Sequence, residues 1–204
     1  MPGPAVLHGD RVTLRTVERD DAAFMQRSSA DPEIRVPLGS SMPENENQAE
    51  SNIEEWVEND KGVSLLVCVE GADGEDEDEP EGDGEADDDG PVPIGMVAAK
   101  GVRWDRTELV YWFVPEYQGE GYGTESIARF ADYVFESFPT HRMHIRAFDF
   151  NQGSRGVARK LGFEEEGRFR EARFVRGEYV DVCHYGMLRR EWAETGPLAD
   201  LVSR

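Results

Sequence analysis

The sequence predicts an α+β fold built on one mixed sheet, with helices inserted among the strands. Short stretches rich in β-branched and apolar residues are interspersed with amphipathic helical stretches, and strand-like stretches lie towards both ends of the chain. With 204 residues, of which 38% are apolar, the chain can bury one sizeable core. We therefore expect residues 1–204 to form a single domain, and not a doubly wound parallel fold.

The first elements are a strand and two helices. Residues 11–16, RVTLRT, alternate apolar and polar side chains, which is typical of a strand, and RDDAAFMQRSSA opens with the acidic residues that favour a helix N-terminus. Ser41 and Glu44 stand at capping-box spacing ahead of an apolar stripe and predict a second helix. The stripe consists of Ala49, Ile53, Trp56 and Val57.

Three strands and a long helix follow. Residues 63–69 and 93–99 predict two strands that are antiparallel neighbours joined by a long loop. Residues 108–114 predict a third strand, which ends at Pro115 just before a glycine-rich stretch. The next residues keep helical spacing over about four turns. The apolar positions of this helix are Ile127, Phe130, Ala131, Val134, Phe135 and Phe138.

The last third of the chain predicts one more helix between strands. Residues 143–148 form a strand pattern, and residues 154–163 predict a short helix that stops at Gly162. Two further strand-like stretches lie near residues 166–175 and 179–188.

The acidity of the chain is concentrated in one segment. Residues 70–90 hold 13 of the 43 acidic residues and no basic residue. Such a segment repels itself and has nothing to bury, so we expect a disordered insertion at about residues 70–91. A net charge of −21 disfavours nucleic acid and anionic membranes as partners. An acidic surface with few lysines also suits high salt, so a halophilic source is a hypothesis.

Cysteine and histidine spacing indicates no disulfide and no metal site. Cys68 and Cys183 lie far apart, and the four histidines lack metal-ligand spacing. We expect both cysteines to be buried. No apolar run approaches the roughly 20 residues that span a bilayer, and the first residues lack signal-peptide features. These patterns predict a soluble, cytoplasmic protein.

The stretch YQGEGYGTES, residues 117–126, joins a predicted strand to a predicted helix. Gly119, Gly121 and Gly123 would let the backbone approach a phosphate at the helix N-terminus. Gln118 can donate its side-chain amide, and Thr124 can cap the helix or donate its hydroxyl. The stretch therefore predicts an anion-binding loop.

Two nucleotide-binding motifs fit this stretch poorly. A Walker loop ends in G-K-[ST], and no lysine occurs here. A dinucleotide fingerprint has glycine where Thr124 stands, and it occurs in an early βαβ unit. Taken alone, the stretch leaves open a ligand-free helix-entry turn and a nucleotide-binding protein.

Two motifs resemble the GNAT N-acetyltransferase superfamily. Q-x-x-G-x-G at Gln118, Gly121 and Gly123 resembles its acyl-CoA pyrophosphate loop. Asn151, Ser154 and the following KLGF resemble its N-x-x-[AS] helix and K-x-G-F ending. GDRVTLRTVERDDA and HYGMLRREW are similar to the RimJ/RimL-like branch, which acetylates ribosomal-protein N-termini. The resemblance covers nearly the whole chain apart from the acidic insertion and the last residues.

The resemblance implies a fold and a reaction. The fold would be a mixed, mostly antiparallel sheet, splayed at its middle strands and flanked by helices. Acetyl-CoA would be the co-substrate, and no metal would take part. A primary amine, at a protein N-terminus or on a small molecule, would attack the thioester directly in a ternary complex. The oligomeric state stays open, a homodimer included.

The resemblance also implies the residues that contact acetyl-CoA. The strand edge would pair with the pantetheine arm, the loop amides would bind the pyrophosphate, and residues of the next helix would contact the arm and a phosphate. The implied residues are Phe113, Val114, Gln118, Gly119, Gly121, Tyr122, Gly123, Thr124, Asn151 and Arg155.

The resemblance implies the catalytic residues less clearly than the acyl-CoA loop, because relatives use different residues for proton transfer. Glu108 and Glu171 are the candidate bases. Many relatives use a tyrosine as the acid, but this chain has Ala158 at that position. Ser154 is then the candidate acid, with an N-cap of the short helix as its alternative role. Tyr185 is a more remote candidate.

Two departures from the family pattern keep a second function open. Ala158 removes the usual proton donor, and Glu120 puts a carboxylate in the loop where relatives commonly carry a basic residue. A catalytically silent acyl-CoA-binding module would show the same departures. An N-acetyltransferase is the leading interpretation.

Overall fold

The computed structural model describes residues 2–57, 61–70 and 90–195. The strands are β1 (Ala5–His8), β2 (Thr13–Thr16), β3 (Gly62–Val69), β4 (Val92–Lys100), β5 (Arg106–Phe113), β6 (Arg142–Phe148), β7 (Glu164–Val175) and β8 (Glu178–Leu188). The helices are η1 (Arg19–Asp21), α1 (Ala22–Ala30), α2 (Pro32–Arg35), α3 (Glu46–Asn52), η2 (Ile53–Val57), η3 (Pro115–Tyr117), α4 (Tyr122–Ser137), α5 (Gln152–Lys160) and α6 (Arg189–Thr195).

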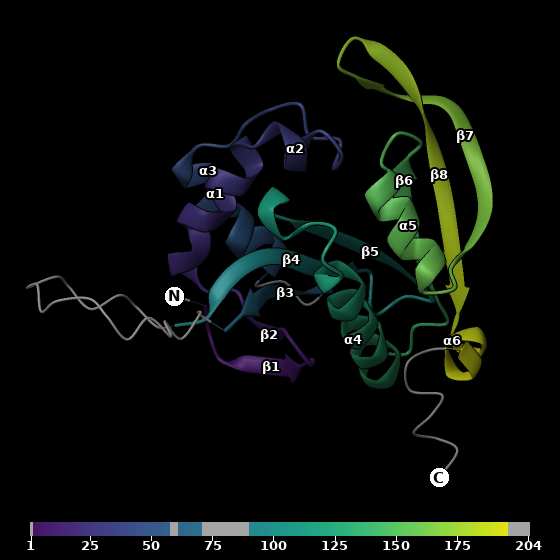
Figure 1. Ribbon diagram of the computed structural model, residues 1–204, viewed down its shortest axis with the longest axis horizontal. Helices are drawn as coiled ribbons and strands as arrows, with labels where there is room; N and C mark the ends of the chain where they lie inside the picture. Colours follow the sequence, from purple (N-terminus) through teal and green to yellow (C-terminus); the bar gives the residue numbers. More distant parts are fainter. Residues whose placement is uncertain (1, 58–60, 71–89, 196–204) are drawn as a thin grey trace, which may run out of the picture.

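The described strands form one sheet in the order β1-β2-β3-β4-β5-β6-β8-β7 (Figure 1). Every neighbouring pair is antiparallel except β5 and β6, which run parallel. The parallel pair arises because α4 carries the chain from the end of β5 back to the start of β6. The predicted mixed, mostly antiparallel sheet is thereby confirmed, as is the antiparallel pairing of β3 with β4.

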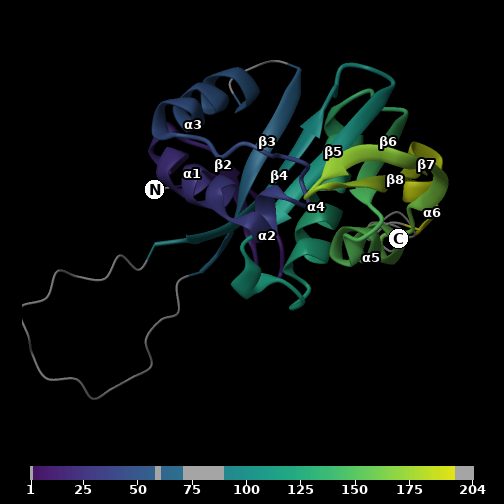
Figure 2. The ribbon, with the colours of Figure 1, turned by 90° about the horizontal axis from the view of Figure 1, so that it is seen from above.

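Helices cover both faces of the sheet (Figure 2). On β3, Leu65 and Val67 join the core beneath α4, whereas Leu66 and Cys68 join the core beneath α1, α2 and α3. Successive side chains of a strand point to opposite faces, so a strand buried on both sides reads as a continuous apolar run. This is why residues 63–69 show no polar alternation.

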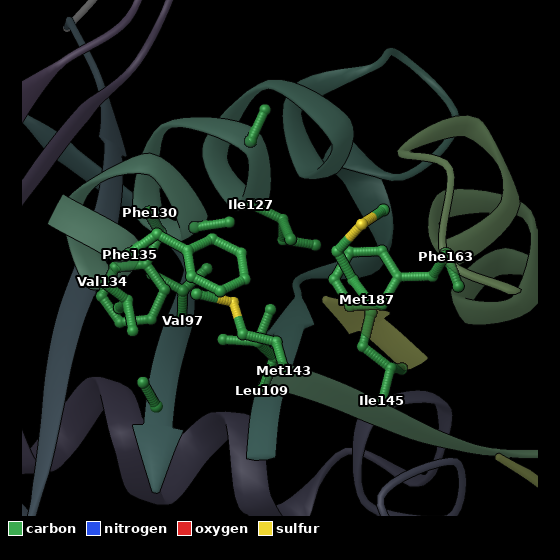
Figure 3. Close-up of a cluster of buried hydrophobic side chains, with 14 of the residues drawn as sticks. Val97, Leu109, Ile127, Phe130, Val134, Phe135, Met143, Ile145, Phe163 and Met187 are labelled. Atoms are coloured by element: carbon green, nitrogen blue, oxygen red, sulfur yellow. The ribbon is translucent and has the colours of Figure 1, made fainter. Parts of the chain in front are cut away.

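The larger core packs the apolar stripe of α4 against the sheet (Figure 3). Ile127, Phe130 and Val134 point from α4 towards Val97 and Met143 on the strands. All five are at most 1% exposed, and burying a side chain of this size stabilises the fold by roughly 1.5–3 kcal/mol. The helical spacing after the glycine-rich stretch is confirmed.

Several local predictions need correction. The second helix begins at Glu46, not after Ser41, because Asn45 and Gln48 form the capping box there. Three elements of seven residues or fewer are present that the sequence patterns do not predict, namely β1, α2 and α6. Short elements carry too few residues to show a period.

Some predictions fall where the structure gives no description. Most of the predicted acidic insertion, residues 71–89, lies outside the described residues, and so do the side chains of Trp56 and Val57. In the described part of the chain, no helix is long and apolar enough to cross a membrane. Cys68 and Cys183 are free thiols and fully buried, as predicted.

A buried hydrogen bond attaches α6 to α4 and provides a stability test. Trp192 Nε1 donates to Asp132 Oδ1 at 2.7 Å, and both residues are buried. Asp132→Ala leaves the indole N–H without its acceptor, so we expect a loss of about 1–3 kcal/mol in the free energy of unfolding, measured by urea titration. Asp132→Asn keeps an acceptor oxygen and should lose less; equal losses for the two variants would contradict the assignment.

Candidate active site

The site begins where β5 and β6 separate. The two strands pair only at Arg106–Glu108 and Arg142–His144. Beyond Glu108, β5 continues beside β4 as far as Phe113, while β6 continues beside β8 as far as Phe148. Each strand keeps one neighbour and loses the other, so the sheet opens at its middle. The predicted splay is confirmed.

Two cavities meet in this opening. The loop cavity, of about 330 Å³, is lined by the glycine-rich stretch and α5. The hairpin cavity, of about 540 Å³, is lined by β5, β6 and the β7-β8 hairpin. The residues that line both cavities are Pro37, Leu38, Tyr111, Asn151 and Ser154. A ligand in the loop cavity and a ligand in the hairpin cavity would therefore meet at Tyr111 and Ser154.

The glycine-rich stretch forms a helix N-terminus beside the loop cavity. Gly119 and Gly121 have φ values of 86° and 94°, which favour glycine. Glu125 N donates the first helical hydrogen bond, to Gly121 O at 3.1 Å. The amides of residues 122–124 therefore precede the helical ladder, as in helix N-termini that bind phosphate. Gly121, and not Thr124, is the N-cap of α4.

Close packing explains the third glycine. A Cβ atom at Gly123 would lie 3.1 Å from Phe113 Cε2, tighter than ordinary contact between a side chain and its neighbour.

Gln118 Nε2 donates to Phe113 O at 2.8 Å, so the amide expected to bind phosphate holds the loop against β5. Val114 N donates to Ile94 O, and Val114 O accepts from Tyr117 N. Phe113 is thus the residue whose backbone faces the opening.

Arg11, two residues before β2, lies beside the glycine-rich loop. Its Nη1 donates to Glu120 O at 3.0 Å, its Nε pairs with Glu125 at 3.2 Å, and its guanidinium lies 4.6 Å from the centre of the Tyr122 ring. Glu120 is exposed and does not line the loop cavity. Arg11 thus puts a positive charge next to Gly121, the basic group that the loop sequence lacks. No local sequence signal links residues 109 positions apart.

Tyr111 and Ser154 form the polar pair at the junction of the cavities. Their hydroxyl oxygens lie 2.9 Å apart, and Tyr111 OH also lies 3.2 Å from Ser154 O. Burial raises the pKa of Tyr111 to about 12, so the phenol stays protonated at neutral pH. Asn151 Oδ1 accepts from Ser154 N at 3.0 Å, which makes Asn151 the N-cap of α5. The alternative role of Ser154 as N-cap is wrong.

Tyr111 is not indicated as a site residue by the sequence alone. It lies within an apolar strand, where a tyrosine is typical of a core residue, and Ser154 is 43 positions further on. The available signal for a site residue was a tyrosine hydroxyl in the strand that leads into the glycine-rich loop. Ala158, at the family's tyrosine position, is fully buried against the core.

The two candidate bases occupy different environments. Glu108 lines the hairpin cavity, where Arg146 Nε donates to its carboxylate at 2.7 Å. Glu171 is exposed at an irregular position of β7, with a φ of 48°, and its amide donates to Asp181 at 2.9 Å. Among the described residues, Glu171 lines neither cavity. The fold therefore brings only Glu108 to the site.

Arg155 belongs to a separate network on the far side of α5. Its Nε donates to Tyr185 OH at 3.1 Å, and its Nη1 donates to Asp149 O at 2.7 Å. Tyr185 OH in turn donates to Glu165 at 3.0 Å. Of the described residues, neither Arg155 nor Tyr185 lines the loop cavity or the hairpin cavity. Both are disfavoured as site residues.

Residues 11–164 match the acetyltransferase (GNAT) domain family. A putative ribosomal N-acetyltransferase, YdaF of Bacillus subtilis, is 36% identical over 43% of this chain, and the matched stretch spans about half of that relative (48%). The uncharacterized N-acetyltransferase p20 of Bacillus licheniformis is 25% identical over 92% of this chain and 98% of its own length.

Solved structures share the fold at lower identity. Spermidine N-acetyltransferase from Vibrio cholerae, in complex with CoA and spermine, has a TM-score of 0.74 at 21% identity and covers 89% of this chain and 98% of its own. RimL, the ribosomal L7/L12 α-N-protein acetyltransferase, in complex with coenzyme A, has a TM-score of 0.72 at 14% identity and covers 91% and 98%. These likenesses show the fold.

His144 provides a pH test at the parallel pair. Burial, and then the positive charge of Arg106, lower its pKa from 6.5 to about 4. Between these values the unfolded chain binds a proton that the folded protein does not, so this histidine destabilises the fold as the pH falls from about 6.5 to about 4. We expect His144→Gln to lose less stability over this window than the unmodified protein, measured by urea titrations at several pH values.

The exposed His8 supplies the matched control, since His8→Gln also removes one imidazole. If the stability of His144→Gln depended on pH as that of the unmodified protein and of His8→Gln does, the inference that His144 is neutral when buried would be wrong.

Proposed function

Because the chain belongs to the acetyltransferase (GNAT) domain family, we propose that it transfers the acetyl group of acetyl-CoA to a primary amine. The observation that carries this proposal is the meeting of the two cavities at Tyr111 and Ser154. One cavity has the backbone of an anion-binding loop, and the other is open to a second ligand. A two-substrate transfer needs this arrangement.

The loop cavity fits the pyrophosphate and pantetheine parts of acetyl-CoA. Its lining includes five glycines, and a Cβ atom at Gly156 or Gly119 would meet nothing within 4 Å. The amides at the start of α4 favour an anion, and Lys160 in the lining offsets the one lining carboxylate, that of Glu33. We propose that Phe113 and Asn151 hold the pantetheine arm. Acetyl-CoA supplies the acetyl group as an activated thioester.

The amine needs little help to become reactive. Acetyl transfer forms a C–N bond, breaks the C–S bond and moves one proton from the amine nitrogen to sulfur. An α-amine with a pKa of about 7.7–8.0 is about one-tenth neutral at pH 7. Glu108 is the proposed base because it lines the hairpin cavity, from which the amine would arrive. Glu171 has weaker support because it is exposed outside both cavities.

Ser154 and Tyr111 are the proposed route for the proton that reaches sulfur. Either hydroxyl of the pair can donate to the other. Ser154 can therefore give a proton to the leaving sulfur and recover one from Tyr111. A phenol with a pKa of about 12 is a weak acid beside a thiol of about 8.5, so it serves best as a link in this chain and as a hydrogen-bond donor.

In more detail, we propose a RimJ/RimL-like enzyme of one domain, residues 1–204, that acetylates a protein N-terminus or a small amine. YdaF, a putative ribosomal N-acetyltransferase, and the fold shared with RimL support it. A cytoplasmic setting at high salt is part of the same proposal. Ala158, in place of the family's tyrosine, favours a second candidate, an acyl-CoA-binding module without turnover. CoA binding without thiol release for any amine would identify the module.

Gly156→Leu tests the loop cavity. A Cβ atom at Gly156 would meet nothing within 4 Å, the residue lines the cavity, and leucine stabilises a helix interior relative to glycine by roughly 1 kcal/mol. We expect the affinity for CoA to fall by at least about tenfold, measured by calorimetry, with no loss of thermal stability. Gly167→Leu is the matched control, because Gly167 is equally open and lines neither described cavity. Unchanged CoA affinity in Gly156→Leu would overturn the assignment.

Tyr111→Phe and Ser154→Ala test the proton route. Each should lower kcat by about 10²-fold or more while the KM for acetyl-CoA changes little, measured by thiol release. Because the two hydroxyls act as one unit, the double variant should lose about as much as either single variant. Tyr185→Phe, outside the cavities, should keep its kcat; a larger loss in Tyr185→Phe than in Tyr111→Phe would reverse the assignment.

A further inference from the structure

The hairpin cavity carries a charge opposite to that of the chain. Its described lining includes the basic side chains of Lys100, Arg146 and Arg173 and one carboxylate, that of Glu108. The whole chain has 43 acidic and 22 basic residues. A lining with three cations to one carboxylate reverses that ratio at the place where the second ligand would bind.

Carboxylates on the neighbouring strands pair with arginines outside the lining. Glu166 forms an ion pair with Arg142, and Asp181 forms one with Arg168 at 3.7 Å. Glu108 is itself bound by Arg146. The Arg146–Glu108 pair compensates one of the three positive charges of the lining, and the neighbouring carboxylates, paired with other arginines, leave a net positive charge in this cavity.

Arg173 is the cation most open to a ligand. It lies on β7, is exposed, and donates one long hydrogen bond, to Ala172 O at 3.4 Å. Among the described residues, no carboxylate forms an ion pair with it. A guanidinium can bind a carboxylate through two parallel hydrogen bonds.

The titration of two nearby histidines agrees with a positive potential here. Burial, and then Arg106, lower the pKa of His144; burial, and then Arg146, lower the pKa of His184. His184 lines the cavity, and His144 lies beside it on β6. Burial is the larger cause of both pKa shifts, and the neighbouring arginines add to it.

We infer that the amine acceptor of this protein carries an anionic group, a carboxylate, which binds Arg173. Lys100 and Arg146 add positive charge to the same cavity. This inference rests on the proposed acetyl transfer. The amine would lie towards Tyr111 and Ser154, and the carboxylate would lie towards β7. A polyamine would bring further positive charges against three cations and only one carboxylate, which is unfavourable in a partly buried site. The carboxylate can belong to a free amino acid or to an acidic residue behind a peptide N-terminus.

The first experiment compares matched acceptors with the unmodified protein and acetyl-CoA. The peptide set is a dipeptide amide with glutamate in second place and its glutamine and lysine counterparts. The small-molecule set is alanine, alaninamide and spermidine. We expect kcat/KM, measured by thiol release, to be about tenfold or more higher for the carboxylate member of one set, which identifies the source. A preference for the neutral or cationic members would overturn the inference and leave acetyl transfer intact.

The second experiment tests whether Arg173 reads the carboxylate. Arg173→Glu should remove the preference by raising the KM for the carboxylate acceptor about tenfold, with the KM for acetyl-CoA unchanged. Arg170→Glu is the matched control, because Arg170 is exposed on the same strand and lines neither described cavity. Equal effects of the two variants would indicate a general change of net charge and would overturn the local assignment.

Binding measurements separate this inference from the proposed function. The acetylated glutamate and glutamine dipeptide amides cannot react further, so their affinities for the protein with CoA can be measured by calorimetry. Tighter binding of the glutamate compound, lost in Arg173→Glu and kept in Arg170→Glu, would support the inference even if no amine were acetylated. Equal affinities of the two compounds would overturn it.

Discussion

The short parallel pairing of β5 with β6 is the constraint on which the rest of the site depends. It lasts for three residue pairs and ends at Glu108 and His144. The paired end of β5 is tied to the segment that leads into β6. Thr107 and Thr140 share a buried hydrogen bond of 2.8 Å, and Arg189 donates to Thr140 O and to Phe138 O at the end of α4. Beyond Glu108 and His144, β5 keeps its hydrogen-bond ladder with β4 and β6 keeps its ladder with β8, so each strand stays paired although the two separate.

The opening brings together groups from separate helices and strands. It admits the N-terminal end of α4 from the end of β5 and that of α5 from the end of β6. The helix ends supply unpaired amides, and the strand supplies Tyr111, whose hydroxyl meets Ser154 on α5. The other side is lined by three cations, Lys100 of β4, Arg146 of β6 and Arg173 of the β7-β8 hairpin. A chain that is acidic overall thus presents a glycine-rich helix N-terminus and a basic cavity on the two sides of one hydroxyl pair.

The sequence predicted the strands, α4 and the loop because each has a local physical signature. Apolar runs reveal buried strands, helical spacing reveals α4, and Gly119 and Gly121 occupy positions with positive φ. Contacts between distant residues have no such signature, so the sequence indicates neither the pairing of Tyr111 with Ser154 nor the hydrogen bond of Arg155 to Tyr185. Which of two adjacent polar residues caps a helix also depends on tertiary contacts, as Asn151 shows.

Hydrogen exchange in the presence and absence of CoA tests the central claim that the opening between β5 and β6 receives this ligand. A bound ligand slows exchange of the amides it contacts and of the segments it stabilises. We expect slower exchange in peptides that cover residues 113–124 and 151–160, and little change in residues 13–16 of β2. Protection confined to other segments, or equal protection by ATP, would contradict the account.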